Sequence, residues 1–285
     1  MSLEVPCADG SNAVVVPVAP LGSSRMSARE PGDFVALTET WDMPMPIIEQ
    51  DMLFRRYQVL SDLARGTRVL EIGCGTAMGN DVLCEVADFV ASFDLELDNV
   101  RAGQARVKGS FGVGDAQSLP FASASFDVVA GFEMAYYVPD QEAMIAEAVR
   151  VLRPDGALFL AVANPERPAF HRSPHSTAYL TARTSTALFA RHGLAAEVSG
   201  VFPISDSPVS KVLRLAIRTA TALHLVPKTL GGRAFLKRVV QGKLAPYPGH
   251  RTVQERASTI PTPVGVPGDR PCAGYSVLYV VGRRA

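Results

Sequence analysis

Short apolar runs alternate with stretches of helical periodicity along most of the chain. The runs do not alternate polar and apolar residues, and this is typical of strands buried on both faces of a parallel sheet. Five such runs lie at 68–72, 88–94, 110–113, 126–131 and 157–163, and two more follow at 194–202 and 275–281. The pattern predicts an α/β fold with a doubly wound, mostly parallel sheet of seven strands.

Helical periodicity also precedes the first strand and separates the last two. Between 47 and 64, apolar residues recur at helix-like steps and Gly66 follows, so we expect a helix that forms a lid over the ligand-binding end of the sheet. About 70 residues separate the last two strands, whereas an ordinary α/β connection has roughly 2–6. Helical patterns at 208–225 and 231–244 indicate that this insertion is a helical cap.

The chain is therefore expected to divide into four parts. Residues 1–46, rich in Pro, Gly, Ser and Ala over the first 33 positions, form a flexible N-terminal arm. Residues 47–202 form the α/β core with its lid helix, and residues 203–274 form the helical cap. Residues 275–285 return to the core as its last strand.

Composition narrows the possible functions. The 28 Lys and Arg balance the 28 Asp and Glu, and zero net charge argues against nucleic acid as a partner. Cys7, Cys74, Cys84 and Cys272 include no CxxC pair and no zinc-like spacing, so we expect reduced thiols, no bound metal and a cytoplasmic location. A signal peptide fits 13–22 poorly because prolines interrupt it, and no apolar run reaches the roughly 18 residues of a membrane span.

A glycine-rich turn follows the first strand of the predicted core. Residues 69–79 have the sequence VLEIGCGTAMG, in which Gly73 and Gly75 allow the backbone to turn sharply and to approach a ligand closely. Asp94 ends the next strand nineteen positions after Gly75, and a carboxylate there can accept hydrogen bonds from a ribose diol. A nicotinamide-dinucleotide enzyme would have similar spacing, but the GxGxxG motif is absent.

Two further segments help to decide whether the chain is such a nicotinamide-dinucleotide enzyme. Residues 114–133 have the sequence GDAQSLPFASASFDVVAGFE, and residues 147–162 have the sequence EAVRVLRPDGALFLAV, with a turn predicted at 153–156. Together with the glycine turn and Asp94, they resemble the class I S-adenosylmethionine-dependent methyltransferases, specifically the type 11 group. The resemblance covers about residues 66–163 and implies a Rossmann-like fold with S-adenosylmethionine as the cofactor.

The resemblance also assigns residues to the cofactor. Glu71, Gly73 and Gly75 match the first motif of the family. Many members have a third glycine in this motif, and in this chain Ala77 stands in its place. Asp94 would bind the ribose hydroxyls, with Glu96 as the alternative, and Leu95 lies beside it. The side chain of Asp115 and the backbone of Ala116 would contact the adenine, and Phe132 and Glu133 would face the methionine part. The corresponding cofactor residues are Glu71, Gly73, Gly75, Asp94, Leu95, Asp115, Ala116 and Phe132.

Methyl transfer to a hydroxyl needs an in-line approach, and a base that removes the proton assists it. His175 is the first candidate for this base, and His171 the second, because both follow the fifth strand on the ligand side. Glu133 is a third candidate, or it could orient the acceptor. Each of these residues could instead make only structural hydrogen bonds. Tyr136 and Tyr137 are expected to shape the pocket or to pack within it.

The acceptor is expected to be a small molecule, methylated most readily on oxygen, with nitrogen and carbon as alternatives. From Ser207 to Gln254 there is no Asp or Glu, and this segment holds nine basic residues: Lys211, Arg214, Arg218, Lys228, Arg233, Lys237, Arg238, Lys243 and Arg251. This asymmetry indicates an anionic or carrier-linked acceptor, contact with an anionic membrane surface, or simply a solvated face. A cofactor-binding module without catalysis is the competing class of function.

Overall fold

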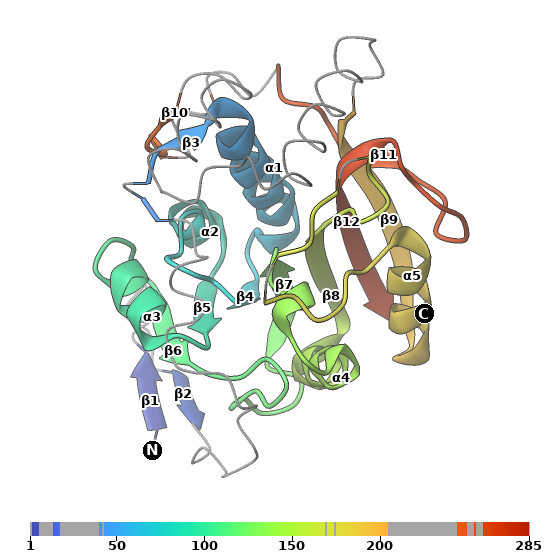
Figure 1. Cartoon of the computed structure of the whole chain (residues 1–285). Helices are drawn as coiled ribbons and strands as arrows, with labels where there is room; N and C mark the ends of the chain where they lie inside the picture. The colour runs from blue at the N-terminus through green and yellow to red at the C-terminus, as the bar shows by residue number, and fades with distance from the viewer. Residues whose placement is uncertain are drawn as a thin grey trace.

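The structure of the chain is a computed structural model that describes residues 2–5, 14–17, 40–41, 43–168, 170–173, 175–204, 244–249, 254 and 259–284. The predicted helix 208–225 lies outside these residues, and so does the predicted helix 231–244 except for its last residue. All nine basic residues of the predicted cap lie outside them as well. Within the described part, the chain has the expected α/β architecture (Figure 1).

One mixed sheet organises the described residues, in the order β11-β9-β12-β8-β7-β4-β5-β6. Its parallel part consists of β4 (Arg68–Ile72), β5 (Phe89–Asp94), β6 (Ser110–Val113), β7 (Phe126–Phe132) and β8 (Leu152–Ala163). The antiparallel edge consists of β9 (Leu194–Pro203), β12 (Tyr275–Arg284) and β11 (Val264–Gly265). The doubly wound, mostly parallel sheet predicted from the apolar runs is therefore confirmed.

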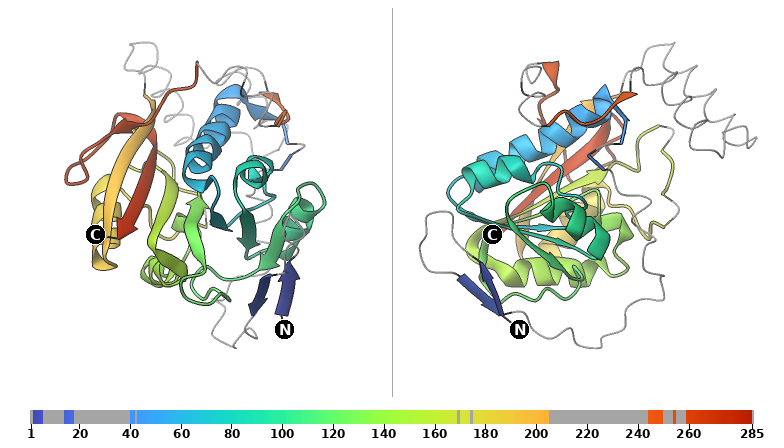
Figure 2. Two further views of the ribbon diagram at one scale, coloured as in Figure 1. Left: turned by 180° about the vertical axis from the view of Figure 1, so that it is seen from behind. Right: turned by 90° about the vertical axis from the view of Figure 1, so that its left-hand side faces the viewer.

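The helices follow the strands on both faces of the sheet. They are α1 (Ile47–Ala64), α2 (Asn80–Val86), α3 (Leu97–Gln104), the 3₁₀ helix η2 (Ala135–Tyr137), α4 (Gln141–Val151) and α5 (Ala182–Arg191). The predicted helix 47–64 is confirmed as α1, and the sheet lies between α1 and α4 when viewed along its edge (Figure 2). None of the helices among the described residues has the length and apolar character needed to cross a membrane.

Two expectations about the strands were wrong. Among the described residues the sheet has eight strands rather than seven, because the two-residue strand β11 pairs with Gly200 and Ser199 of β9 at the edge. A two-residue edge strand carries no periodicity that a sequence pattern could reveal. In addition, the segment 153–156 belongs to β8 instead of forming a separate turn. The register shifts here, since Phe126 pairs with Leu152 whereas Val128 pairs with Ala157, so the Pro-Asp-Gly sequence forms a bulge in the strand.

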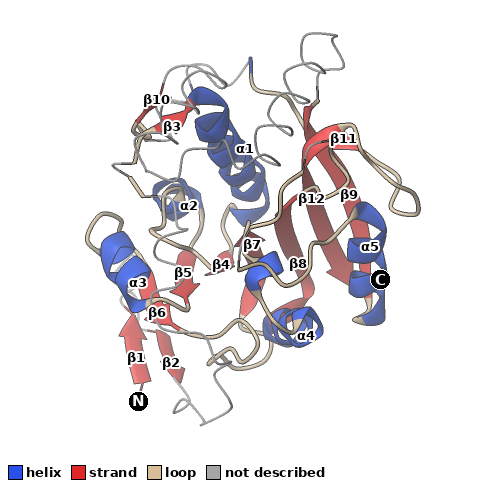
Figure 3. Ribbon diagram, viewed as in Figure 1, coloured by secondary structure: helices blue, strands red, loops and turns tan. Residues whose placement is uncertain are grey.

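The predicted cap and arm also contain short strands (Figure 3). In the range 203–274, the described residues include β10 (Leu244–Ala245) as well as β11, and β10 pairs with β3 (Met45–Pro46) just before α1. In the N-terminal range, β1 (Ser2–Val5) and β2 (Val14–Pro17) form an antiparallel pair. The described residues of the predicted helical cap therefore include two short strands, and one of them, β10, pairs with the chain just before α1.

Each face of the sheet has its own apolar core. On one face, α4 and α5 contribute residues such as Met144 and Phe189 to a cluster with β7, β8 and β12. On the other face, α1 buries Phe54, Tyr57 and Leu60 against a second cluster that includes Phe132. Burial of these side chains is the main stabilising contribution, at about 1.5–3 kcal/mol for each large apolar side chain. The second core holds α1 against the face of β4 and β7.

Candidate active site

The sheet changes direction at β4. From β4 the chain proceeds outward through β5 and β6, then crosses to β7 on the other side of β4. In open α/β sheets, ligands bind at such a switch point, outside the carboxyl ends of the strands. Gly73, Asp94, Asp115 and Glu133 lie at or just beyond the carboxyl ends of β4, β5, β6 and β7 respectively. The fold thus brings these four residues together at the carboxyl ends of the strands, which is called the ligand edge below.

The glycine turn after β4 has a left-handed backbone at three alternate positions. The φ angles are +67° at Gly73, +54° at Gly75 and +58° at Ala77. A Cβ on Gly73 would lie 2.7 Å from the side chain of Met134, so this glycine also allows the end of β7 to approach. Ala77, in the position of the missing third glycine, keeps the left-handed conformation at a cost of about 1–2 kcal/mol. The alanine does not change the course of the turn.

Glu71 lies beneath this turn and is 1% exposed. One carboxylate oxygen, Oε1, accepts a hydrogen bond of 2.5 Å from the Tyr57 hydroxyl of α1. The other oxygen, Oε2, is buried without a hydrogen-bond partner. Burial raises the pKa of Glu71 to about 7, although the Tyr57 hydrogen bond and the Arg56 charge oppose this shift. The side chain is therefore poised between its neutral and charged forms near neutral pH.

Asp94 is tied to the backbone around it. Its Oδ2 accepts from the Gly75 amide at 2.8 Å, and its Oδ1 accepts from the Glu96 amide at 2.9 Å and from Asn99 Nδ2 at 3.2 Å. A carboxylate has about four lone-pair positions, so these donors leave roughly one for a further partner. Apolar surface flanks the Asp94 carboxylate. The next residue, Leu95, is 48% exposed, and Val113, which pairs with Asp94 in the sheet, is 38% exposed.

Asp115 and Ala116 form a tight turn directly after β6. Both oxygens of Asp115 accept from Gln117 Nε2 at 3.0 Å, and Oδ1 also accepts from the Gln117 amide at 2.9 Å. Gln117 Oε1 in turn accepts from the amide of Asp140, the residue that caps α4. Sequence reasoning did not single out Gln117, because an ordinary polar residue in a turn gives no signal by itself. It links the adenine end of the predicted site to α4.

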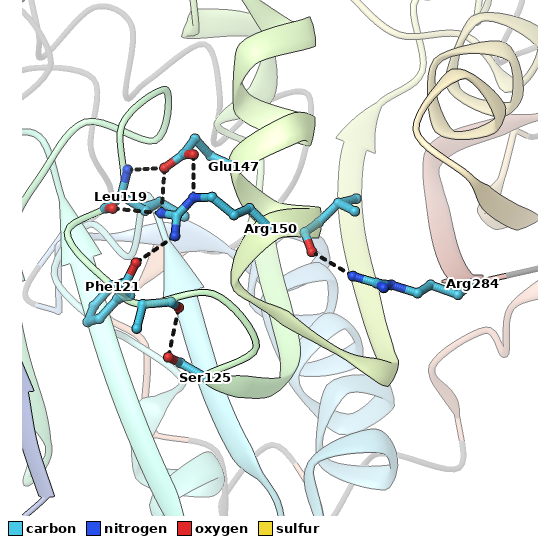
Figure 4. Close-up of polar contacts among 8 residues, drawn as sticks. Leu119, Phe121, Ser125, Glu147, Arg150 and Arg284 are labelled. Atoms are coloured by element: carbon cyan, nitrogen blue, oxygen red, sulfur yellow. Dashed lines mark hydrogen bonds and ion pairs between the residues drawn. The ribbon is translucent and has the colours of Figure 1, made fainter.

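The segment that follows Asp115 is held from α4 by Arg150 (Figure 4). The guanidinium donates to the carbonyls of Leu119 and Phe121 at 2.9 and 2.7 Å, and it pairs with Glu147 at 2.6 Å. Glu147 accepts from the Leu119 amide as well, at 2.7 Å. The Arg150 guanidinium holds the pKa of Glu147 below its ordinary value. This network fixes the connection between β6 and β7 and therefore supports the turn that contains Asp115.

At the end of β7, the side chains of Phe132 and Glu133 lie in different surroundings. Phe132 is 5% exposed, and its ring packs edge-on against Tyr57 at 5.1 Å and Phe159 at 5.3 Å. Glu133 has a φ of +53°, its amide donates to the Ala161 carbonyl, and its Oε2 accepts from the Tyr136 hydroxyl at 2.9 Å. A glutamate in a left-handed conformation is uncommon and often marks a functional site.

The two predicted histidines lie in the segment that follows β8. His171 is exposed, whereas His175 is half-buried. The Thr177 amide donates to the Tyr136 carbonyl at 2.7 Å, and the Tyr179 ring stacks on Tyr136 at 4.5 Å. These contacts place the histidine segment beside η2, on the same side as Glu133. They also give Tyr136 a defined role, since it joins this segment to Glu133.

Three residues at this edge were missed by sequence reasoning. Tyr57 reaches Glu71 from α1, and Trp41 Nε1 donates to the carbonyl of Thr76 in the glycine turn at 3.0 Å. Tyr279 of β12 shares a cross-strand row with Ala161 and Phe132, and its hydroxyl is buried without a hydrogen-bond partner. Burial raises the pKa of Tyr279. No sequence pattern marks them, because each belongs to an element remote from the motifs.

In the described part of the chain, no group of three or more His, Cys, Asp and Glu residues is arranged so that it could hold a metal ion. A surface hollow of about 470 Å³ lies among Arg68, Asp127 and Arg153. These residues are at the starts of β4, β7 and β8, opposite the glycine turn, so the hollow is separate from the candidate active site.

Known proteins resemble the chain in sequence and in fold. Residues 70–160 match the methyltransferase domain family. A probable S-adenosylmethionine-dependent methyltransferase of Mycolicibacterium smegmatis is 35% identical over 182 residues, which make up 59% of this chain and 69% of that protein. The 27-O-demethylrifamycin SV methyltransferase of Amycolatopsis mediterranei is 36% identical over 140 residues, which make up 44% of this chain and 51% of that protein.

The fold agrees with solved methyltransferases. A structure from Thermotoga maritima, described as a possible histamine N-methyltransferase, has a TM-score of 0.53 at 14% identity and covers 84% of this chain and 95% of its own. The chain belongs to the S-adenosylmethionine-dependent methyltransferases, and it is an enzyme that uses S-adenosylmethionine. The predicted class and cofactor are confirmed, whereas a nicotinamide oxidoreductase and a module without catalysis are set aside. The chain spans 69% of the first relative and about half of the second, at 51%.

Proposed function

We propose that this methyltransferase transfers the methyl group to a hydroxyl of a small molecule. The observation that supports oxygen as the acceptor is Glu133, a carboxylate placed just past the end of β7 in a left-handed conformation. A carboxylate that accepts a hydrogen bond from the Tyr136 hydroxyl can also act as a base and take one proton from an acceptor hydroxyl. The Amycolatopsis relative is by its name an O-methyltransferase of a small molecule, in keeping with this proposal.

The residues at the ligand edge fit the cofactor. Glu71 keeps a buried oxygen without a hydrogen-bond partner, Asp94 has roughly one lone-pair position left, and Leu95 exposes 48% of its surface next to it. We propose that Gly73, Gly75, Glu71, Asp94, Leu95, Asp115, Ala116 and Phe132 hold the cofactor. The bound cofactor supplies a methyl group made electrophilic by the sulfonium.

The chain contributes positioning, exclusion of water and proton removal. α1 and the rings of Tyr57, Phe132 and Phe159 form a closely packed apolar cluster next to the end of β7. Such a wall excludes water from one side of the reacting atoms and restricts the acceptor to an in-line approach of about 3–3.5 Å. Glu133 holds the proton released by the hydroxyl. His175, and then His171, are the alternatives for this last role.

Substitution of the three candidates tests this assignment. With Glu133 as the base, Glu133→Gln lowers kcat at least about a hundredfold, the usual contribution of a general base. His175→Asn and His171→Asn then change kcat by less than about threefold, and the exposed His171 is the matched control for the half-buried His175. A large loss in His175→Asn together with an active Glu133→Gln would transfer the role to the histidine.

The nature of the new bond tests oxygen as the acceptor. The enzyme is incubated with methyl-deuterated S-adenosylmethionine and a set of phenols, alcohols, carboxylic acids and amines, and the products are identified by mass spectrometry. Methyl esters are cleaved in mild alkali, whereas methyl ethers are not, so the two oxygen products can be distinguished. Transfer to the phenols, alcohols or acids supports the proposal. Transfer only to amines or to carbon would contradict it.

The cofactor residues are tested by binding. Asp94→Ala and Asp115→Ala each remove a carboxylate from the edge, and we expect each to weaken S-adenosylmethionine binding at least about tenfold, the value of one good charged hydrogen bond. Asp98→Ala is the control, because Asp98 is 72% exposed on the nearby helix α3. Wild-type affinity in both site variants, measured by calorimetry, would refute the assignment.

We further propose an anionic or carrier-linked acceptor, bound by the acid-free segment between Ser207 and Gln254. Cations in this segment would attract a phosphate or carboxylate on the acceptor. The double variant Arg214→Glu with Arg218→Glu is expected to raise the KM of such an acceptor and to leave cofactor affinity unchanged. Equal kinetics in the double variant and the wild type would contradict this part of the proposal.

A further inference from the structure

A buried hydrogen bond joins α1 to the acidic residue of the glycine turn. The Tyr57 hydroxyl donates to Glu71 Oε1 at 2.5 Å, although the two residues belong to different elements and only 1% of each is exposed. We infer that Tyr57 is a positioning residue for the cofactor, which fixes Glu71 so that its second oxygen receives the ammonium group at the amino-acid end of S-adenosylmethionine. The inference rests on the proposed cofactor role of Glu71 and does not depend on the proposed acceptor.

Packing leaves Tyr57 little freedom to move. A Cβ on Gly79, the residue that caps α2, would lie 2.0 Å from the Tyr57 ring, so the ring occupies the space that any other residue at 79 would need. On its other side, the ring packs edge-on against Phe132 at 5.1 Å. The hydroxyl is therefore directed at Glu71 by the packing of the ring between α2 and β7. A rigid donor of this kind selects one orientation of the carboxylate.

The second oxygen of Glu71 is the unusual feature of this pair. Oε2 is buried and has no hydrogen-bond partner. A buried carboxylate oxygen without a donor costs free energy, and a bound ammonium group would supply the missing donor. The groups that act on Glu71 are Tyr57 and Arg56 from α1 and Asp94 from β5, and of these only Arg56 carries a positive charge.

The segment before α1 makes a second contact with the same turn. Trp41 Nε1 donates to the Thr76 carbonyl, so the chain from Trp41 to Tyr57 holds the glycine turn at both of its ends. This second tie explains how α1 can act on the cofactor without depending on the hydroxyl of Tyr57 for its own placement. Removal of that hydroxyl should therefore leave α1 in position.

Calorimetry with two probes tests the inference without methyl transfer. S-adenosylhomocysteine carries the ammonium group, whereas 5′-methylthioadenosine lacks the whole amino-acid part. We expect Tyr57→Phe to weaken binding of S-adenosylhomocysteine about tenfold, the value of one charge-assisted hydrogen bond, and to change binding of 5′-methylthioadenosine less than twofold. Tyr275→Phe is the matched control, because the Tyr275 ring packs on Gly200 in the same way, with a Cβ distance of 2.3 Å.

The pH dependence supplies a readout that a purely structural role would not change. Since the pKa of Glu71 is about 7, affinity of the wild type for S-adenosylhomocysteine should fall as the pH drops through this value. The Tyr57 hydrogen bond lowers the pKa of Glu71, so Tyr57→Phe should move this fall to higher pH. Binding of 5′-methylthioadenosine should show neither effect.

Two results would overturn the inference. One is wild-type affinity of Tyr57→Phe for both probes, and the other is an equal loss for both. If Tyr57→Phe does not fold, Glu71→Gln decides the matter, because it keeps an oxygen for Tyr57 and removes the charge. Selective loss of S-adenosylhomocysteine binding by Glu71→Gln supports the inference, and unchanged binding refutes it.

Discussion

The cofactor side and the acceptor side of this enzyme are built from contacts of very different range. On the cofactor side, Gly75 and Asp94 are 19 positions apart, Tyr57 and Glu71 are 14 apart, and Asp115 binds a residue only 2 positions away. Some contacts outside these motifs join segments that are much farther apart in the sequence. Gln50 binds the Ala245 carbonyl across 195 positions, and Asn164 binds the Cys272 carbonyl across 108.

This difference in range would allow the two sides to change independently of each other. A cofactor that does not change can be held by short, self-contained motifs, each of which follows one strand. The proposed acceptor side would depend on where distant segments meet, so a change in residues 203–274 would be expected to alter that side without disturbing the cofactor motifs. Variants that affect one side and not the other can test this division.

The largest effect is expected where α1 meets the cofactor side. In Gly79→Ala, the new Cβ would lie 2.0 Å from the Tyr57 ring, which is buried and cannot move without displacing α1. Overpacking of this kind costs about 3 kcal/mol in the free energy of unfolding. We expect a clear fall in Tm by calorimetry, together with weaker binding of S-adenosylhomocysteine.

Gly66→Ala is the matched control for this substitution. Gly66 has a φ of +68°, but no atom lies within 4 Å of the place that a Cβ would take, so alanine there introduces only backbone strain. Such strain costs about 1–2 kcal/mol and should leave S-adenosylhomocysteine affinity unchanged. Equal effects of the two variants on both stability and binding would show that the contact between Tyr57 and Gly79 does not control the cofactor side.

The next effect concerns the pH dependence of stability. In the folded chain the pKa of Glu71 is about 7, whereas its ordinary value is 4.5. Between these values the unfolded chain releases the proton and the folded chain keeps it, so this contribution is fully present below pH 4.5 and is lost as the pH rises through about 7. The loss amounts to about 3 kcal/mol. Glu71→Gln should remove it.

Urea unfolding at a series of pH values measures this contribution as the difference between wild type and Glu71→Gln. Taking the difference removes the opposite effect of carboxylates with lowered pKa values, such as Glu147. A difference that does not vary with pH would show that Glu71 has an ordinary pKa, and that burial beneath the glycine turn does not favour its neutral form.

Two buried asparagines test the division between the cofactor side and the proposed acceptor side, because each forms its hydrogen bonds on only one of them. Asn164 donates to the carbonyls of Cys272 and Tyr275 at 2.6 and 2.8 Å, whereas Asn99 donates to Asp94 at 3.2 Å. We expect Asn164→Ala to cost about 2 kcal/mol of stability, because it removes the buried donor of two partly buried hydrogen bonds, and to keep wild-type S-adenosylhomocysteine affinity. Asn99→Ala should weaken that affinity instead. The reverse pattern would contradict the division into two sides.

The same difference in range determines what could be predicted from the sequence. α1 and the strands from β4 to β9 were predicted within a few residues, apart from the start of β8, because apolar runs and glycine turns are local signals. Glu71, Asp94, Asp115 and Glu133 were predicted to lie around one cofactor, and the strand order brings them to the same end of the strands. The cofactor itself followed from the resemblance to a family.

The remaining features could not be predicted from the sequence, for a physical reason. The two-residue strand β11 and the bulge in β8 depend on pairing partners, and no pattern within the strands themselves reveals these. Tyr57 and Trp41 are ordinary apolar positions in the sequence, and only the packing of α1 on the glycine turn gives their polar atoms a function. Tyr279 joins the row of Phe132 because β12 returns to the sheet after the insertion.

The smallest effect concerns Asp140 and Gln117, which are joined by a hydrogen bond and are expected to have different roles. Asp140 caps α4 by accepting from the Ala143 amide at 3.0 Å, and its own amide donates to Gln117, which in turn binds Asp115. Asp140→Ala should cost about 1 kcal/mol of stability, the usual value of a helix cap, and leave S-adenosylhomocysteine affinity unchanged. Asp140→Asn keeps an oxygen acceptor and should recover most of this loss.

Gln117→Ala should behave in the opposite way. It removes the donor that orients both oxygens of Asp115, so we expect a severalfold loss of S-adenosylhomocysteine affinity with a change in Tm smaller than that of Asp140→Ala. Calorimetric titration and thermal unfolding of the two variants measure both quantities. If Asp140→Ala weakened binding as much as Gln117→Ala, then α4 would be part of the cofactor site, and the boundary between scaffold and site would have to move from Gln117 to the helix.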